Sequence, residues 1–315
     1  MYGQFFVLFA IVFTGYFFRK YNIIDDAMNH GLNKFIVYFA YPCMIVHNIG
    51  TIEMSGQLMR SFLITFGISC GMFALYSVYS YIYCRLRKFP ADSSNVAEMA
   101  MSSPNNGFMG FPVALIFFGE TGLLLMLAHN AAMNFYFFSY GLLLLRRNSP
   151  DKSELTAAGI ARGLVKVLIN PNILALFIGF AICLTGIDFE GTAIDTYLTS
   201  IGNVATPMAM IFIGSSLTGS SIRDIIRDRL VVETSLNKLV LIPALTYLAV
   251  IFLPVSGIMK SILVLGSCFP VAATVSMLAE QEHQNQDLSS RALFLSTIVS
   301  MASIPAAITV INILI

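Results

Sequence analysis

Residues 101–112 read Met-Ser-Ser-Pro-Asn-Asn-Gly-Phe-Met-Gly-Phe-Pro, and the expected architecture of the chain follows from this segment. Pro104 removes a backbone donor and disfavours helix at the residue before it, so the run 104–107 predicts a break in a helix. The segment lies within an apolar stretch, 96–118. Unwound polar backbone at membrane depth is tolerated only where it lines a cavity or packs on protein. We therefore expect a broken membrane helix whose asparagines face a site.

The composition extends this expectation to the whole chain of 315 residues, of which 57% are hydrophobic and 11% are charged. A soluble domain carries about 25% charged residues, so most of this surface cannot face water. Apolar stretches long enough to span a bilayer recur throughout. The sequence predicts an all-α polytopic membrane protein with ten transmembrane helices, near 5–18, 35–49, 62–83, 96–118, 123–145, 173–187, 197–217, 231–253, 261–278 and 292–315.

Lysine and arginine are distributed unevenly between the two sides of these helices. Sixteen of the 18 lie in or beside the connections that follow odd-numbered helices, and the other two are Arg60 and Lys260. Cytoplasmic loops retain positive charge, so we expect both termini outside and the connection 146–170 in the cytoplasm. The expected location is the cell (inner) membrane, with the lipid bilayer as partner.

Proline spacing predicts an internal duplication. Pro42 precedes Pro104 by 62 residues, and Pro207 precedes Pro270 by 63 residues. Each half of the chain holds five predicted helices, an odd number, so the second half would be inserted upside down. Inverted repeats of this kind are typical of secondary transporters, whose site lies near the bilayer midplane. We expect a first five-helix repeat over 1–147, a cytoplasmic linker over 148–170 and a second, inverted repeat over 171–315.

A second break is expected in the ninth helix, where the sequence reads Gly-Ser-Cys-Phe-Pro-Val-Ala-Ala-Thr over 266–274. If helices 4 and 9 are both broken and cross, two half-helix N-termini meet. Each terminus carries roughly +0.5 charge and free N–H donors, which together suit one carboxylate without any arginine. The candidate substrate-binding residues at these breaks are Pro104, Asn105, Asn106, Gly107, Pro270, Val271 and Thr274.

Further short motifs occur in a characteristic order along the chain. They are Gly15-Tyr16 with Arg19-Lys20, Leu32-Asn33-Lys34 before Tyr41-Pro42, the segment 105–112, Asn170-Pro171, Pro207 with 214–217, Lys238 with Pro243, Pro270, and Ser300 with Pro305. In this order the chain resembles the auxin efflux carrier family, which includes plant auxin carriers and bacterial malonate and malate permeases. The likeness covers nearly the whole chain, and the short loops are similar to those of the bacterial members.

The resemblance implies a particular division of the molecule. Helices 1, 2, 6 and 7 would form a scaffold, and helices 3–5 and 8–10 would form a transport domain that moves like an elevator. The family also implies a homodimer through the scaffold helices, and it places Asn105 at the crossover asparagine.

Four other polar residues are candidates for substrate binding, each with a structural alternative. Asn130 and Asn134 share one face of the fifth helix, and interhelical hydrogen bonding is an equally good interpretation of them. His47 is a candidate for substrate contact or for carrying a proton, and its structural alternative is a neutral, hydrogen-bonded histidine. Lys238 either supplies a second cationic partner for a dicarboxylate or snorkels to the cytoplasmic headgroups.

Several classes of function are excluded or left open by the sequence. A net charge of +1 without a basic patch gives no case for nucleic acid. No metal-ligand spacing, nucleophile elbow or nucleotide motif is present, so we expect no metal, no cofactor and no enzymatic activity. The leading hypothesis is a secondary transporter or uniporter of small organic anions. The alternatives are a sodium-coupled symporter of the bile-acid-transporter type and a membrane sensor without transport.

Overall fold

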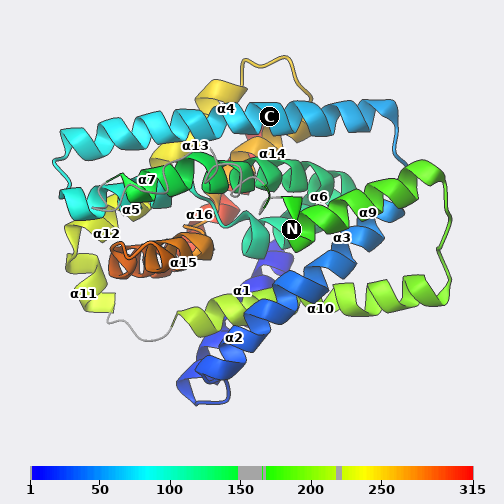
Figure 1. The fold of residues 1–315 in the computed structure, drawn as a ribbon, viewed down its shortest axis with the longest axis horizontal. Coiled ribbons are helices and arrows are strands. Elements are labelled where there is room, and N and C mark those ends of the chain that lie inside the picture. The colour runs from blue at the N-terminus through cyan, green and yellow to red at the C-terminus, as the bar shows by residue number, and fades with distance from the viewer. Residues whose placement is uncertain (1, 148–164, 166–167, 218–221, 315) are drawn as a thin grey trace.

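The computed structural model describes residues 2–147, 165, 168–217 and 222–314, and in these ranges the chain is helical, its only β pairing being one isolated bridge (Figure 1). The all-helical prediction is confirmed. Length and composition mark five described helical stretches as able to cross a membrane, and two shorter helices are also apolar. The five are Gly56–Leu86, Asn106–Arg146, Ala193–Ser216, Arg229–Val250 and Gln286–Ile311; the shorter two are Pro171–Thr185 and Gly257–Cys268. Most of the predicted linker 148–170 lies outside the described residues.

The first helices follow local sequence signals. Helix α1 spans Tyr2–Lys20, and α2 spans Asp26–Phe35 with the side chain of Asp25 as its N-cap. A π-helical turn, η1 (Ile36–Ala40), leads without interruption into α3 (Tyr41–Gly50), which carries Pro42 in its first turn. The predicted start of this helix at residue 35 was wrong, because α2 is polar and hydropathy does not detect it. Lys34 therefore lies on a helix rather than in a loop.

The middle of the chain contains the first predicted break. Helix α4 spans Gly56–Leu86, and α5 spans Ala91–Ser102, where it ends one residue before the Ser103–Pro104 peptide. Helix resumes as η2 (Asn106–Gly110) and α6 (Phe111–Tyr136), followed by η3 (Phe137–Gly141) and α7 (Leu142–Arg146). Gly119 interrupts α6 with φ of 64°, a backbone conformation that strongly favours glycine.

The second half contains the second break. Its helices are α9 (Pro171–Thr185), α10 (Ala193–Ser216), α11 (Ile222–Arg227), α12 (Arg229–Leu236), η4 (Asn237–Leu241), α13 (Ile242–Val250), α14 (Gly257–Cys268), α15 (Ala273–Gln281) and α16 (Gln286–Leu314). The helix stops at Cys268 and restarts at Ala273, on either side of Pro270, as predicted.

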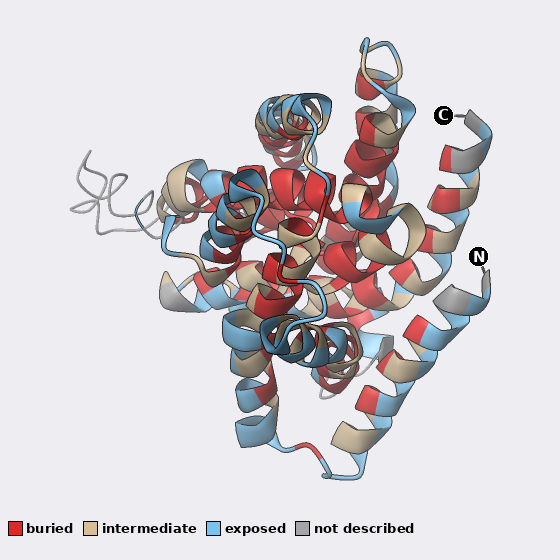
Figure 2. Cartoon of the chain, turned by 90° about the vertical axis from the view of Figure 1, so that its right-hand side faces the viewer, coloured by how far each residue is buried: buried red, intermediate tan, exposed pale blue. Residues whose placement is uncertain are grey.

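Close backbone contact joins α1 to α10 through two glycines. A Cβ atom on Gly15 would lie 2.2 Å from the carbonyl oxygen of Ile211, and one on Gly214 would lie 1.8 Å from that of Val12. Only glycine permits this approach, and small residues are the usual means by which helices associate in membranes. In Figure 2 the buried residues concentrate in the centre of the molecule.

Polar contacts divide the helices into two bundles. We define the first bundle as α1–α3, α9 and α10, and the second bundle as α4–α7 and α11–α16. Every ion pair between described residues of different helices lies within one bundle, such as His47–Asp195 in the first and Arg147–Glu98 in the second. In the described part of the chain, a single hydrogen bond joins the bundles, from Tyr41 Oη to the carbonyl oxygen of Phe108 at 3.4 Å.

Candidate site at the helix crossover

The two broken segments meet through an antiparallel β-bridge between Pro104 and Val271. The Asn105 N–H donates to the Pro270 carbonyl at 2.8 Å, and the Ala272 N–H donates to the Ser103 carbonyl at 2.9 Å. Pro104 and Val271 thus form an antiparallel pair of the non-hydrogen-bonded type, in which the two opposed residues make no hydrogen bond with each other. Pro104 therefore sits where the bridge needs no N–H, and Pro270 contributes only its carbonyl. Proline breaks both helices here without leaving the bridge short of a donor.

Side chains from neighbouring helices complete the hydrogen bonding of the second break. The N–H of Val271 donates to Ser296 Oγ of α16 at 3.0 Å, so this buried donor is satisfied. Lys238 Nζ donates to the carbonyl oxygen of Ser267, in the last turn of α14, at 2.8 Å. The last carbonyls of a helix lack intrahelical partners and carry partial negative charge, which favours a cation at this position.

Free backbone donors remain at the two helix starts. The N–H groups of Gly107, Ala273 and Thr274 have no acceptor among the described residues. A Cβ atom on Gly107 would meet nothing within 4 Å, so its backbone borders open space. Helix N-termini with free N–H groups attract anions. The crossover therefore has the donors and the partial charge that a carboxylate requires.

Asn105 stands at the start of η2, where its side chain caps a helix and also faces a cavity. Its Oδ1 accepts a hydrogen bond from the Phe108 N–H at 3.3 Å, which caps the new helix. The same side chain lines a cavity of about 20 Å³, together with Phe212 of α10 and Ala273 and Thr297 of the second bundle. A cavity of this size holds about one water molecule. A carboxylate could enter only if α10 and the crossover moved apart.

Two buried polar atoms at the crossover lack partners in the described part of the chain, Asn106 Oδ1 and Ser103 Oγ. Such atoms are costly unless a ligand, a water or a conformational change supplies a partner. Asn106 Nδ2 lies 3.7 Å from the sulfur of Met133 on α6.

Asn130 and Asn134 are buried on α6, beside the second half of the broken helix. Met126 and Met133 contact the positions of Gly110 and Asn106 respectively. Residues 126, 130 and 133 share one helix face by their i, i+4, i+7 spacing, so Asn130 faces the crossover. No side-chain hydrogen bond of either asparagine occurs among the described residues.

Lys238 and His47 lie in different surroundings. Lys238 is fully buried, so the alternative of snorkelling to the headgroups is wrong. His47 lies in the last turn of α3, where its Nδ1 is 3.0 Å from Asp195 Oδ1 of α10. It lines a separate cavity of about 150 Å³, which also includes Leu115 of α6 and Asn203 of α10. His47 therefore belongs to a chamber between the bundles and not to the crossover itself.

The structure thus brings most of the predicted site residues together. Pro104, Asn105, Asn106, Gly107, Pro270 and Val271 form the crossover, with Thr274 in the first turn of α15. Sequence reasoning missed Ser103, Ser296 and Thr297. Ser103 adjoins the predicted break and could have been included, but nothing in the sequence pairs α16 with residue 271. No group of three metal-ligating side chains occurs among the described residues.

Comparison with known proteins identifies relatives over nearly the whole chain. A transporter of uncharacterized function from Methanothermobacter thermautotrophicus is 25% identical over 297 residues, covering 94% of this chain and 93% of that protein. A Rhizobium meliloti protein named "Putative malonate transporter" is 26% identical over 311 residues, covering 94% and 91%. A family model described as membrane transport protein matches residues 1–308. With that match over nearly its whole length, the chain belongs to the membrane transport protein family, the auxin efflux carrier family that its motifs resemble.

Proposed function

We propose that this protein is a secondary transporter of small organic anions, with carboxylates as its substrates. The observation that carries the proposal is the meeting of two half-helix starts whose free N–H groups lie beside the side chain of Asn105. The positive ends of two helices can bind one carboxylate in a low-dielectric interior without a fully charged side chain. The Rhizobium relative bears a malonate transporter name, which favours short carboxylic acids as the first substrates to test.

A dicarboxylate requires a second positive group. Lys238 is fully buried and bonds to the last turn of α14, whose breakpoint forms part of the crossover. We propose that Lys238 offsets the second charge of a dianionic substrate while it holds the end of α14.

The proposed motion is an elevator-like shift of the second bundle, as transport domain, against the first bundle, as scaffold. The contact between the bundles is largely aromatic, since Tyr41 packs against Phe111 with ring centroids 5.5 Å apart and Phe108 against Phe212 at 4.9 Å. Apolar contacts are non-directional, so one surface can shift over the other without breaking a set of hydrogen bonds. The crossover lies in the second bundle and would move with it.

The proposed topology is ten membrane helices in two inverted repeats, 1–147 and 171–315. The stretch Asn106–Arg146 has 41 residues, about 60 Å of helix and twice the bilayer core, so we divide it into two spans at Gly119. In the proposed repeat, α9 is the counterpart of α1, and α10 is the counterpart of α3. When each helix is exchanged with its counterpart, the α1–α10 contact becomes the α9–α3 contact, which the structure also contains. The same exchange turns the α4–α5 contact into the α13–α14 contact, which supports a repeat.

The proposed orientation places both termini outside the cell membrane. Figure 1 shows α5, α11 and α12 at one end of the molecule and the connections after α3 and α9 at the opposite end. The first end carries the arginines of the α4–α5 and α11–α12 regions, which we assign to the cytoplasm. A homodimer through α1, α3, α9 and α10 remains part of the proposal.

Uptake by proteoliposomes tests this function directly. Purified protein would be reconstituted and supplied with labelled malonate, malate, a monocarboxylate or an indole acid, each with and without a sodium or proton gradient. We expect saturable uptake of at least one acid, and the gradients distinguish sodium coupling from proton coupling and uniport. Protein-free liposomes and liposomes with Asn105→Asp protein are the controls. Absence of carboxylate flux in every condition, with correctly folded protein, would refute transport and favour the sensor alternative.

A further inference from the structure

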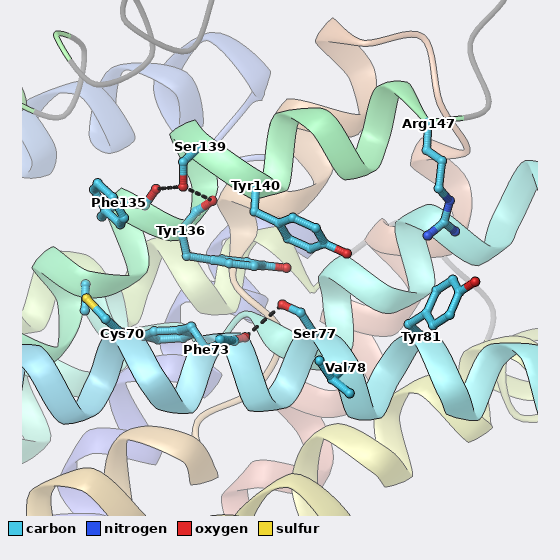
Figure 3. A pocket seen from close by; sticks show the side chains of 12 residues that line it. Cys70, Phe73, Ser77, Val78, Tyr81, Phe135, Tyr136, Ser139, Tyr140 and Arg147 are labelled. Carbon is cyan, nitrogen blue, oxygen red and sulfur yellow. Dashed lines mark hydrogen bonds between the residues drawn. The ribbon is translucent and has the colours of Figure 1, made fainter. Parts of the chain in front are cut away.

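An apolar groove of about 580 Å³ runs along the outside of the second bundle, between α4 and the part of α6–η3–α7 that follows Gly119 (Figure 3). Phe73 and Val78 line it from α4, and Tyr136 and Tyr140 line it from the opposite helix. Figure 3 shows Cys70 near one end of the groove and Arg147 beside Tyr81 at the other. The groove is separate from the crossover cavity and shares no lining residue with it.

The length of this groove matches one leaflet of a bilayer. Cys70 lies near the middle of α4, and Tyr81 lies eleven residues later, about 17 Å along the helix at 1.5 Å per residue. The hydrocarbon core of a bilayer is about 30 Å thick, so half of it is about 15 Å. An acyl chain that followed the groove from the membrane centre would end at the level of Arg147.

A second cavity of about 300 Å³ begins where the groove ends. Arg147 lines both cavities, and the second also contains Arg85, Lys88 and the carboxylate of Glu98. Both carboxylate oxygens of Glu98 accept hydrogen bonds from Arg147, at 2.7 and 2.9 Å. This bond raises the pKa of Arg147, so its guanidinium stays charged. Counting side chains gives three cations and one anion, a net charge of +2.

Two arginines contact the same aromatic ring at this end of the groove. The guanidinium carbons of Arg85 and Arg147 lie 5.1 and 5.6 Å from the centroid of the same Tyr81 ring. Neither Arg85 nor Lys88 has an anionic partner among the described residues. Because Arg147 is paired with Glu98, Arg85 and Lys88 supply the positive charge that remains to be offset, and an anion bound beside them would form charge-assisted hydrogen bonds.

We propose that this groove and the adjoining basic cavity form a binding site for an anionic phospholipid. One acyl chain lies between α4 and α6–η3, and the phosphate contacts Arg85, Lys88 and Arg147. The continuity of the apolar groove with the basic cavity favours a lipid over free phosphate, which would have no use for the groove. In the proposed orientation the lipid comes from the cytoplasmic leaflet and accompanies the second bundle when that bundle moves.

Lipid retention tests the basic end of the site without relying on transport. Purified protein would be equilibrated with equal amounts of phosphatidylglycerol and phosphatidylcholine, and the bound lipids counted by native mass spectrometry. We expect Arg85→Gln/Lys88→Gln to reduce the preference for phosphatidylglycerol by about thirtyfold, at about tenfold per 1.4 kcal/mol and about 1 kcal/mol for each cation. The matched control, Lys20→Gln/Lys34→Gln, removes two exposed cations from the first bundle and should retain the preference. Equal preference in the two variants would overturn the proposal.

The groove needs a test of its own. Ala74 lines the groove, whereas the next residue, Leu75, does not. Ala74→Phe should fill the groove and displace bound phosphatidylglycerol, and Leu75→Phe should leave it bound. Glycerol 3-phosphate, which has the phosphate without the chains, should fail to compete. Competition by glycerol 3-phosphate at the affinity of the lipid, or full lipid retention by Ala74→Phe, would overturn the acyl-chain assignment. Each variant is compared with wild type by size-exclusion chromatography, so that loss of folding is recognised.

Discussion

At the scale of single residues, Asn105 combines two roles that a substitution can separate. Its Oδ1 caps the helix that begins at the crossover, and its side chain lines the small cavity beside Thr297. Aspartate and asparagine are comparable N-caps, but aspartate places a negative charge where the proposed substrate brings another.

We predict that Asn105→Asp keeps the apparent melting temperature of the wild type and abolishes anion binding. Asn105→Ala should lose about 1 kcal/mol of stability through the missing cap and weaken anion binding by about 1–3 kcal/mol. Thermal unfolding in detergent, with and without the transported acid, measures both quantities. If the Asp variant binds the acid as the wild type does, Asn105 does not contact the substrate.

Lys238 also combines two roles that a substitution can separate. It caps the C-terminal end of α14 through the Ser267 carbonyl, and in the proposed function it offsets a charge of the substrate. Lys260 provides the matched control, since its Nζ also donates to a backbone carbonyl near a helix end, that of Ile251, at 2.7 Å.

We expect Lys238→Met to abolish uptake of a dicarboxylate and to spare a monocarboxylate, because only the dianion needs a second positive group. Lys260→Met should leave both activities intact. Uptake of malonate and of a monocarboxylate, measured side by side in proteoliposomes, decides between the roles. Equal losses for the two acids would identify Lys238 as a structural cap alone.

The limits of sequence reasoning are visible at this scale. The helix break at Asn105 and Asn106 could be predicted because a proline beside polar residues in an apolar segment is poorly compatible with a continuous membrane helix. The contact of Ser296 with Val271 could not be predicted, since it depends on how α16 packs against α15. The burial of Lys238 was also inaccessible, because the sequence permits an ammonium to bond inward or to reach the headgroups.

At the scale of helices, the contact of α1 with α10 depends on the absence of side chains at Gly15 and Gly214. Gly31 on α2 offers a control, since a Cβ atom there would meet nothing within 4 Å.

Gly15→Ala should destabilise the protein by about 1–3 kcal/mol, because its methyl group would push α1 away from the Ile211 carbonyl. Gly31→Ala should be neutral or slightly stabilising, since alanine is the better helix former. Apparent melting temperatures of the two variants in one detergent provide the comparison. A Gly15→Ala protein as stable as the Gly31→Ala protein would show that the two helices separate at no cost.

Helix breaks were predicted better than helix starts. The prolines at 104 and 270 fixed both interruptions to within a few residues, because proline acts locally on the backbone. Helix α2 was not predicted, and the second span was therefore started too late. The residues of α2 are polar, so hydropathy does not detect this helix, and the Asp25 N-cap alone is a weak signal. The π-helical turns η1 to η4 have no sequence signature that we can identify.

At the scale of the whole molecule, the proposed elevator motion requires the two bundles to slide past each other. Tyr41 and Phe111 lie on opposite sides of that contact, whereas Tyr79 and Asn237 are hydrogen-bonded within the second bundle.

Cross-linking should therefore have different effects at the two places. In a background without the five native cysteines, a short reducible cross-linker between Tyr41→Cys and Phe111→Cys should stop uptake. The same reagent between Tyr79→Cys and Asn237→Cys should leave uptake nearly unchanged, and reduction should restore the first variant. Continued uptake with the first pair fully cross-linked would exclude relative movement of the two bundles.

A single hydrogen bond joins the described parts of the two bundles, and this also affects how easily the bundles would slide past each other. A contact formed by aromatic rings contains no charges that salt could screen and few groups that titrate. The rate at which an empty carrier returns should therefore respond strongly to temperature and to the viscosity of the surrounding lipid, and only weakly to ionic strength. In the proposed motion, the resistance to sliding would come from the surrounding lipid more than from bonds between the two bundles.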